Sequence, residues 1–305
     1  MASALNLADD QRAARRVDAL ALLDELERRM PFPGAARIGI TGPPGAGKST
    51  LLDALVRALR PRGETVAIVA VDPSSRQTGG ALLGDRIRVR SGAGDPGVFI
   101  RSMAARDRLG GIADSTRAAV VVLAAAFDRV FVETVGVGQS EADVAGLVDT
   151  LVFVGHPDAG DALQSMKAGI LEIPDLFVVN KSDLGPAAAR AASELESGLQ
   201  LGTRAAPPVL VASARDGFGI AALIDAFDAH RASQLESGEL RARRERGCEA
   251  FVFETLENRY GSFGIDALGG EDTLRRRIRA EAPASSFALA AALGQEIEER
   301  LRKPD

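Results

Sequence analysis

One short segment of the chain carries the residue types that hold phosphate groups. The pattern G-x-x-x-x-G-K-S is met by Gly42, Gly47, Lys48 and Ser49, between an apolar strand-like run and a helical run. Glycines let backbone N–H groups turn toward phosphate oxygens, and a following helix adds the positive end of its dipole. Lys48 supplies charge for the β- and γ-phosphates, and the Ser49 hydroxyl is expected to ligate Mg²⁺. The predicted phosphate-binding residues are Gly42, Pro43, Pro44, Gly45, Ala46, Gly47, Lys48, Ser49 and Thr50.

A second segment indicates which base is bound. Asn180-Lys181-Ser182-Asp183 ends an apolar run and matches N-K-x-D. The Asp183 carboxylate can accept hydrogen bonds from guanine N1–H and N2–H₂, whereas adenine offers neither in that arrangement, so ATP would leave the carboxylate unpaired. We expect Asn180 to brace the loop and the Lys181 stem to lie along the base. Downstream, Ser213-Ala214-Arg215 matches the loop whose backbone N–H meets guanine O6, so the sequence predicts GTP.

Two carboxylates end predicted strands and are candidate Mg²⁺ ligands. Asp72 closes one such strand, and Glu133 stands where many GTPases carry the aspartate of D-x-x-G. Carboxyl ends of parallel strands form the ligand-binding edge of such sheets. The alternative is that both are ordinary solvated strand-end carboxylates. Asp85 is a weaker candidate on spacing alone.

The segment after Glu133 predicts how fast the reaction runs. Gly136 is expected to offer its N–H to the γ-phosphate, so that losing this phosphate releases the following loop. Lys48, Glu133 and Gly136 are therefore the predicted catalytic residues. No glutamine directly follows Gly136, where Ras-like enzymes carry the residue that positions the attacking water, and this predicts slow intrinsic hydrolysis. Arg76 is a candidate for stabilising transition-state charge, as is a partner protein.

The elements that position these residues alternate in type. Short β-branched runs separated by helical stretches predict an α/β fold, a P-loop NTPase with a mostly parallel sheet flanked by helices. The expected strands are 37–41, 65–71, 130–133, 151–155, 176–180 and 209–212. We expect three parts: a helical N-terminal extension over 1–36, a GTPase domain over 37–233 and a helical C-terminal arm over 234–305.

Both extensions are predicted from helical spacing. Over Asp9–Met30, Val17, Leu20, Leu23 and Leu26 stand three apart and predict one apolar helical face. After about residue 233 we expect helices over 238–260, 272–280 and 285–301, with Gly261-Ser262-Phe263-Gly264 breaking the first. The long helix either packs back on its own domain or forms a dimerisation or partner-binding arm.

Composition excludes several classes of function. A net charge of −5 gives no overall basic field for nucleic acid, and one cysteine and two histidines are too few for a Cys/His metal cluster. The apolar stretch 118–127 is too short to span a bilayer, and the N-terminus has no signal-peptide pattern. We expect a cytoplasmic protein that binds neither nucleic acid nor membrane.

Together these motifs make the chain resemble the MeaB/ArgK family of P-loop GTPases, G-protein chaperones of adenosylcobalamin-dependent acyl-CoA mutases. The match rests on segments 42–50, 71–75, 79–85, 133–141 and 180–183 and covers roughly residues 10 to 260. The resemblance implies that Asp72, Asp85 and Glu133 surround the magnesium. It also implies that Asp161, Gln164 and Lys167, in a third mobile loop, couple nucleotide state to the mutase. Asp158 departs from the family's usual glycine, and the last forty or so residues match it poorly.

The resemblance also implies a function and partners. The chain would be a GTP-hydrolysing metallochaperone that gates adenosylcobalamin loading and protects or reactivates a mutase, methylmalonyl-CoA mutase or a related isomerase, possibly together with an adenosyltransferase. Family members are typically homodimers through C-terminal helices. The alternatives are a nickel-insertion GTPase, a P-loop kinase linked to amino-acid transport, and a binding module that never hydrolyses GTP.

Overall fold

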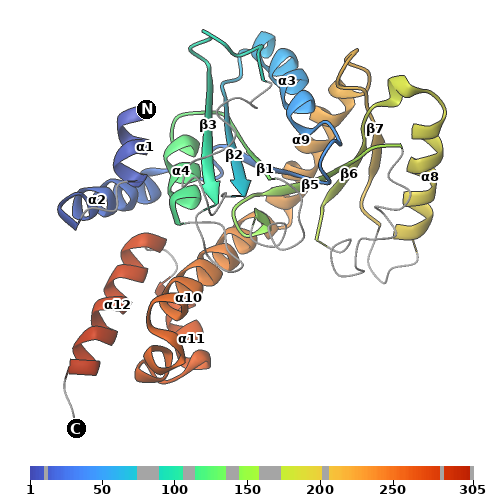
Figure 1. Ribbon diagram of the computed structural model, residues 1–305. Coiled ribbons are helices and arrows are strands. Elements are labelled where there is room, and N and C mark those ends of the chain that lie inside the picture. Colours follow the sequence, from blue (N-terminus) through green and yellow to red (C-terminus); the bar gives the residue numbers. More distant parts are fainter. Residues whose placement is uncertain are drawn as a thin grey trace.

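A twisted sheet of seven parallel strands organises the chain (Figure 1). The computed structural model describes residues 1–9, 13–73, 89–105, 114–134, 144–157, 173–200, 206–281 and 285–302. The strands are β1 (Ala36–Thr41), β2 (Val66–Pro73), β3 (Val98–Ala105), β4 (Arg129–Glu133), β5 (Thr150–Gly155), β6 (Leu176–Val179) and β7 (Val209–Val211). Their order across the sheet is β3-β2-β4-β1-β5-β6-β7, and every pairing is parallel. The predicted fold class is therefore confirmed.

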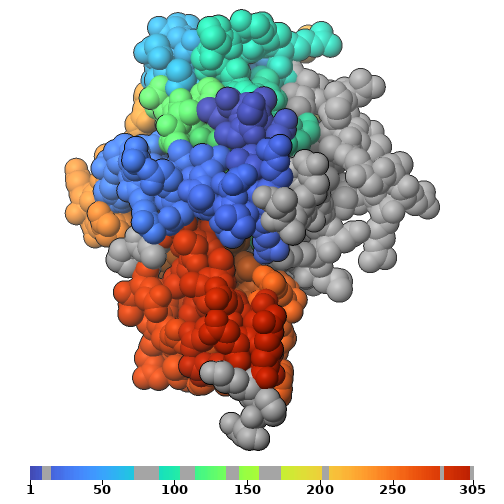
Figure 2. All heavy atoms as spheres, turned by 90° about the vertical axis from the view of Figure 1, so that its left-hand side faces the viewer, coloured from blue at the N-terminus to red at the C-terminus, as the bar shows by residue number. Residues whose placement is uncertain are grey.

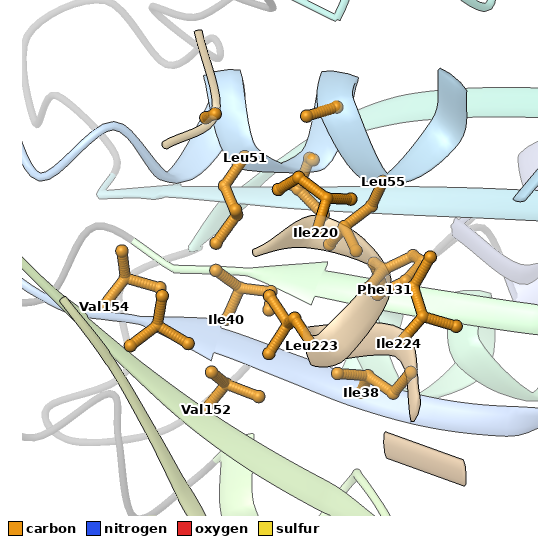
Figure 3. Close-up of a cluster of buried hydrophobic side chains, with 14 of the residues drawn as sticks. Ile38, Ile40, Leu51, Leu55, Phe131, Val152, Val154, Ile220, Leu223 and Ile224 are labelled. Carbon is orange, nitrogen blue, oxygen red and sulfur yellow. The ribbon is translucent and has the colours of Figure 1, made fainter. Parts of the chain in front are cut away.

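One face of the sheet is covered by α3 (Lys48–Leu59) and α9 (Ile220–Glu236). Their apolar side chains meet those of alternate strand residues, as Figure 3 shows for Leu51 and Leu223 against Ile40 and Val152. All four side chains are fully buried. This core fixes the start of α3, which directly follows the phosphate-loop pattern, against the end of β1.

The other face is covered by α4 (Asp114–Ala124), with the N-terminal helices α1 (Ala2–Asp9) and α2 (Ala13–Arg29) packed beside it (Figure 2). Leu23 of α2 is 3% exposed, whereas Val17 is 70% exposed. Including Val17 in the apolar face was therefore wrong. A spacing of three residues drifts around a helix of 3.6 residues per turn, so the first member of the series leaves the buried side. Toward the other end of the sheet, α8 (Ala187–Leu199) packs against β6 and β7.

One edge strand was missed by the sequence patterns. β3 contains Arg101 and Ser102 among its apolar residues, so it lacks the apolar run that marks a buried strand. It pairs on one side only, with β2, and an edge strand tolerates polar side chains. Arg101 uses its exposed position to donate to Asn6 of α1 at 3.1 Å.

The C-terminal helices are α10 (Glu239–Ala267), α11 (Glu271–Glu281) and α12 (Ser286–Arg302), which share a small apolar core of their own. α10 runs seven residues past the predicted end at Tyr260. Gly261, with φ 65° and ψ −172°, leaves the helical conformation and separates two helical segments within α10. The predicted break is therefore confirmed at Gly261, and a second helical segment follows it directly, because glycine adopts this backbone conformation at little cost. No helix in the described ranges is long and apolar enough to cross a membrane.

α10 is fastened to the edge of the sheet where the strands begin. Asp149 directly precedes β5, and its two carboxylate oxygens accept hydrogen bonds from Arg244 Nε and Nη2, both at 2.7 Å. Asp175 directly precedes β6 and accepts from Arg243 at 2.9 Å. Gly247 lies so close to Gly146 that a Cβ there would be 2.2 Å from the Gly146 carbonyl oxygen. The arm is thus tied to the sheet on the side opposite the phosphate loop.

Candidate nucleotide site

The phosphate loop connects β1 to α3 and adopts backbone conformations that favour glycine. Gly42, Gly45 and Gly47 have φ values of 135°, 81° and 88°. At Gly42 a Cβ would stand 2.1 Å from the carbonyl oxygen of Val154 on β5, so only glycine fits there. Pro44 and Gly45 are exposed at the tip, while Thr50 lies in the first turn of α3. The loop therefore curls in front of the N-terminus of α3, where backbone N–H groups are available to phosphate oxygens.

Lys48 lies inside this loop. Its side chain is 7% exposed, and Nζ donates to the carbonyl oxygens of Gly42 at 2.6 Å and Pro43 at 3.1 Å. The loop carbonyls thus hold the ammonium group at the place where phosphate charge would arrive. A buried ammonium group is favourable only where acceptors or negative charge compensate for lost hydration.

Ser49 and Glu133 meet across the gap between α3 and the end of β4. Ser49 Oγ donates to Glu133 Oε1 at 2.7 Å. Burial raises the pKa of Glu133, while the hydrogen bond from Ser49 and the charge of Lys48 act in the opposite direction. A carboxylate and a hydroxyl, partly desolvated and adjacent to a phosphate site, match the oxygen ligands that Mg²⁺ prefers. These two residues therefore fit a magnesium ion.

Of the other predicted metal and switch residues, the structure describes only the backbone of Asp72. Asp72 belongs to the end of β2, two residues beyond Ala70, which pairs with Glu133. The backbone of Asp72 therefore lies at the same edge of the sheet as Glu133, but its side chain is not among the parts that the structure describes. Asp85, Gly136, Arg76, Asp161, Gln164 and Lys167 also fall outside the described residues. Within the described ranges, no three His, Cys, Asp or Glu side chains gather closely enough to hold a metal.

Asn180 joins the phosphate loop to the base loop. It is 1% exposed, and its Nδ2 donates to the Ala46 carbonyl at 2.9 Å. Its Oδ1 accepts from the backbone N–H of Ala214 at 3.1 Å. The structure thus places Asn180 as the brace that the motif predicts. The N–H of Ala214 is engaged by Asn180, so a contact between this N–H and guanine O6 would have to share that bond.

Asp183 is oriented by two neighbours from the second base loop. Ser213 Oγ donates to Asp183 Oδ1 at 3.0 Å, and Arg215 lies 3.6 Å from Oδ2. Lys181 has φ 62°, and its Cε lies 3.8 Å from the position of a Cβ built on Gly47. The two base motifs, which are 30 residues apart in sequence, therefore meet in space.

Two residues on α3 that the sequence patterns did not single out tie this helix to neighbouring segments. Asp53 Oδ1 accepts from the backbone N–H groups of Arg90 and Ser91, both at 2.8 Å. Arg57 lies 3.4 Å from Asp53 and donates to the carbonyl of Ala214, also at 3.4 Å. Asp53 and Arg57 stand one helical turn apart on the helix that follows the phosphate loop. This spacing is the only signal in the sequence that could have marked them.

The phosphate loop, Glu133 and the two base loops lie at the carboxyl edge of the parallel sheet, the edge at which such sheets bind ligands. The phosphate loop, the Ser49–Glu133 pair and the base loops follow β1, β4, β6 and β7 respectively. The arrangement offers backbone donors and an ammonium group for phosphates, oxygen ligands for a cation and an oriented carboxylate for a base. It is suited to phosphoryl transfer from a nucleoside triphosphate.

Comparison with known proteins agrees with this geometry. Residues 1–262 match the family described as methylmalonyl-CoA mutase-associated GTPase MeaB. A putative GTPase of Pyrococcus abyssi is 48% identical over 255 residues, which cover 79% of this chain and 78% of that protein. The mitochondrial methylmalonic aciduria type A homologue of Mus musculus is 39% identical over 80% of this chain and 60% of its own length.

A solved structure extends the likeness to nearly the whole chain. The crystal structure of an LAO/AO transport system kinase superposes with a TM-score of 0.72 at 29% identity, covering 97% of this chain and 92% of that one. The sequence-based assignment to this family is confirmed, as are a P-loop fold and GTP hydrolysis. The chain is therefore a P-loop GTPase that belongs to the MeaB family.

Proposed function

We propose that this GTPase gates the loading of adenosylcobalamin into an acyl-CoA mutase, methylmalonyl-CoA mutase or a related isomerase, and protects or reactivates that enzyme. The observation that carries the proposal is membership of a family described by its association with methylmalonyl-CoA mutase. The name of the mouse relative points to the same metabolic step. An adenosyltransferase is a further proposed partner.

In this proposal the chain's own residues perform the nucleotide chemistry. Lys48 exchanges the carbonyls of Gly42 and Pro43 for the β- and γ-phosphate oxygens. Asp183, held by Ser213, accepts the guanine N–H groups. Ser49 and Glu133, with Asp72 and Asp85, hold the magnesium ion. Bound magnesium would neutralise charge on the β- and γ-phosphates.

Hydrolysis is proposed to be slow and to depend on the partner. Gly136 offers its N–H to the γ-phosphate, and no glutamine directly follows it to orient water. Asp161, Gln164 and Lys167 transmit the nucleotide state to the mutase, and Arg76 or the partner stabilises the transition-state charge.

The assembly is proposed to be a homodimer. We divide the chain into an N-terminal extension (1–36), a GTPase domain (37–233) and a C-terminal arm (234–305) through which the copies associate. The arm has its own apolar core and displays Phe263, which is 71% exposed. The resemblance to a family whose members are typically homodimers through C-terminal helices is what supports this proposal.

The proposal is tested by recovering the partner. The full chain, immobilised with a non-hydrolysable GTP analogue, is expected to retain from its native extract a protein with the visible absorbance of cobalamin. The same bait with GDP should retain less of it. The Lys48→Ala variant should retain no more of the cobalamin protein with the GTP analogue than with GDP. Its own GTP turnover should fall roughly 10²–10³-fold, because one phosphate contact is lost.

Two outcomes would contradict the proposal in different ways. If no cobalamin enzyme is recovered while turnover remains sensitive to Lys48→Ala, the mutase role is wrong and the GTPase stands. If labelled γ-phosphate appears on an acceptor other than water, the kinase alternative gains support. The labelled γ-phosphate is followed because a solved structure that resembles this chain is named a transport system kinase.

A further inference from the structure

Two buried hydroxyl groups face each other beside the nucleotide site. Thr41 is the last residue of β1 and Thr134 directly follows β4; they are 0% and 2% exposed. Thr134 Oγ1 donates to Thr41 Oγ1 at 3.1 Å. The backbone N–H of Thr134 also donates to the carbonyl of Ile40 at 3.0 Å. This contact prolongs the β1–β4 ladder by one step beyond its last strand pair, Ile40 with Glu133.

The position of this pair links the two halves of the catalytic machinery. Thr41 immediately precedes Gly42, where the phosphate loop begins, and Thr134 immediately follows Glu133, which accepts the hydrogen bond from Ser49. Between the two hydroxyls the chain runs through 93 residues, so nothing local keeps them together. Their bond therefore fastens the start of the phosphate loop to the strand end that presents the magnesium carboxylate.

The two threonines do not face the nucleotide. Side chains alternate between the faces of a strand, and Phe131 packs in the core beneath α3 while Val132 packs in the core beneath α4. Glu133 thus projects toward α3 and the phosphate loop, and Thr134 projects to the opposite face. Any effect of Thr134 on the reaction has to act through the backbone that it shares with Glu133.

Valine has nearly the same shape as threonine and would fill the same space at both positions. It has no hydroxyl that needs a hydrogen-bond partner. A hydroxyl taken out of water is costly unless it is hydrogen-bonded, and both hydroxyls are buried. Packing alone therefore gives no reason for threonine at both places. The hydrogen bond between the two hydroxyls is one contact that valine could not make.

We propose that the hydroxyl bridge between Thr41 and Thr134 is a positioning element that sets Glu133 against Ser49 and so determines how strongly Mg²⁺ tightens the binding of GTP. The inference rests on the proposed magnesium site. Neither threonine is a catalytic residue, because neither reaches nucleotide or metal. The bridge holds the carboxylate at its place before the ion arrives, which lowers the cost of organising the site on binding.

The test measures the affinity for a non-hydrolysable GTP analogue with and without Mg²⁺, by calorimetry or a fluorescent nucleotide. In the Thr134→Val variant the tightening caused by Mg²⁺ should shrink about five- to tenfold, the change in a binding constant that one hydrogen bond typically gives. Affinity without Mg²⁺ should stay within about twofold, because the base and phosphate loops are untouched. Thr134→Ser keeps a hydroxyl and should restore most of the Mg²⁺ effect.

Two further variants make the test specific. Thr41→Val removes the same bond from the other side, so it too should shrink the Mg²⁺ effect, and it replaces Thr134→Val if that variant does not fold. In a double-mutant cycle the losses of the two single variants should not add, because both remove the bond that the two hydroxyls share. Thr150→Val is the matched control: Thr150 is 2% exposed and its Oγ1 lies 2.8 Å from Nδ1 of His230, at the opposite end of the strands. It should lower thermal stability and leave the Mg²⁺ effect unchanged.

Failure of the bridge and failure of the metal site are distinguishable. If Glu133→Gln abolishes the Mg²⁺ effect while both valine variants keep it, the bridge has no positioning role. If Thr134→Ser is as impaired as Thr134→Val, or if Thr150→Val is equally impaired, the effect is one of general stability and the inference is wrong. If Glu133→Gln itself leaves the Mg²⁺ effect unchanged, the proposed metal site is wrong and the inference falls with it.

Discussion

Two acids at opposite edges of the same sheet, Glu133 half-buried and Asp149 buried, have very different surroundings. Among the described residues, Glu133 at the carboxyl edge accepts a side-chain hydrogen bond from Ser49, and partial burial raises its pKa. Asp149, at the amino edge, is 2% exposed. Its carboxylate accepts hydrogen bonds from Nε and Nη2 of Arg244 and from the backbone N–H of Arg37. Arg231 lies 3.7 Å from it as well.

The difference fits an acid that stabilises the fold, Asp149, and an acid that the proposed magnesium ion would complete, Glu133. A buried carboxylate surrounded by arginine and N–H donors needs nothing further and fixes the elements that supply those donors. A buried carboxylate with little compensation costs stability and persists where a ligand completes it. The number of donors around a buried acid therefore says more about its role than burial does, and three changes can break or sharpen this comparison.

The largest effect is expected at Glu133. In Glu133→Gln, GTP turnover should fall on the order of 10²-fold or more, because a ligand to the charge-stabilising cation is lost. The folded protein should be at least as stable as the wild type at pH 7 without Mg²⁺. A raised pKa means that the carboxylate destabilises the fold once it is ionised, above its folded pKa, and glutamine removes that ionisation. Turnover assays and denaturant unfolding at pH 4 and pH 7 measure both effects. A clear loss of stability at pH 7 would mean that Glu133 serves the fold.

The second effect concerns Asp149 and should be the reverse. Asp149→Asn leaves Arg244 and its neighbours without their counter-charge, and breaking a buried ion pair costs about 3 kcal/mol of unfolding free energy. GTP turnover per folded molecule should change little, because Asp149 lies at the far edge of the sheet. Glu239→Gln is the matched control, since the pair of Glu239 with Arg246 is exposed and such pairs contribute little. Equal stabilities of the two variants in urea would contradict a structural role for Asp149.

The smallest effect is a pH dependence at the amino edge. Burial lowers the pKa of His230, although the nearby Asp175 acts in the opposite direction. The unfolded chain therefore takes up the proton first as the pH falls below about 6.5, so the folded state loses stability over that range. His230→Gln should flatten the decline of unfolding free energy between pH 7.5 and 5.5. A decline as steep as that of the wild type would place the titrating group elsewhere.

The sequence predicted the elements whose signal is local. The strand before the phosphate loop, the N-K-x-D strand end and the helices after residue 233 each carry a periodicity or motif within one short segment. β3 was missed because an edge strand with Arg101 and Ser102 has no such signal. Val17 was misplaced because spacing alone does not decide which side of a helix finds a partner.

The sequence by itself thus determined that the chain binds a guanine nucleotide, since Gly42–Thr50 and Asn180–Asp183 are contiguous motifs whose chemistry is contained in their residue types. Only the tertiary structure decided which partners these carboxylates and hydroxyls meet. Glu133 meets Ser49 across 84 residues of chain, Asp149 meets Arg244 across 95, and Thr134 meets Thr41 across 93. Such contacts depend on the strand order of the sheet, and strand order leaves no local trace in the residues that it brings together.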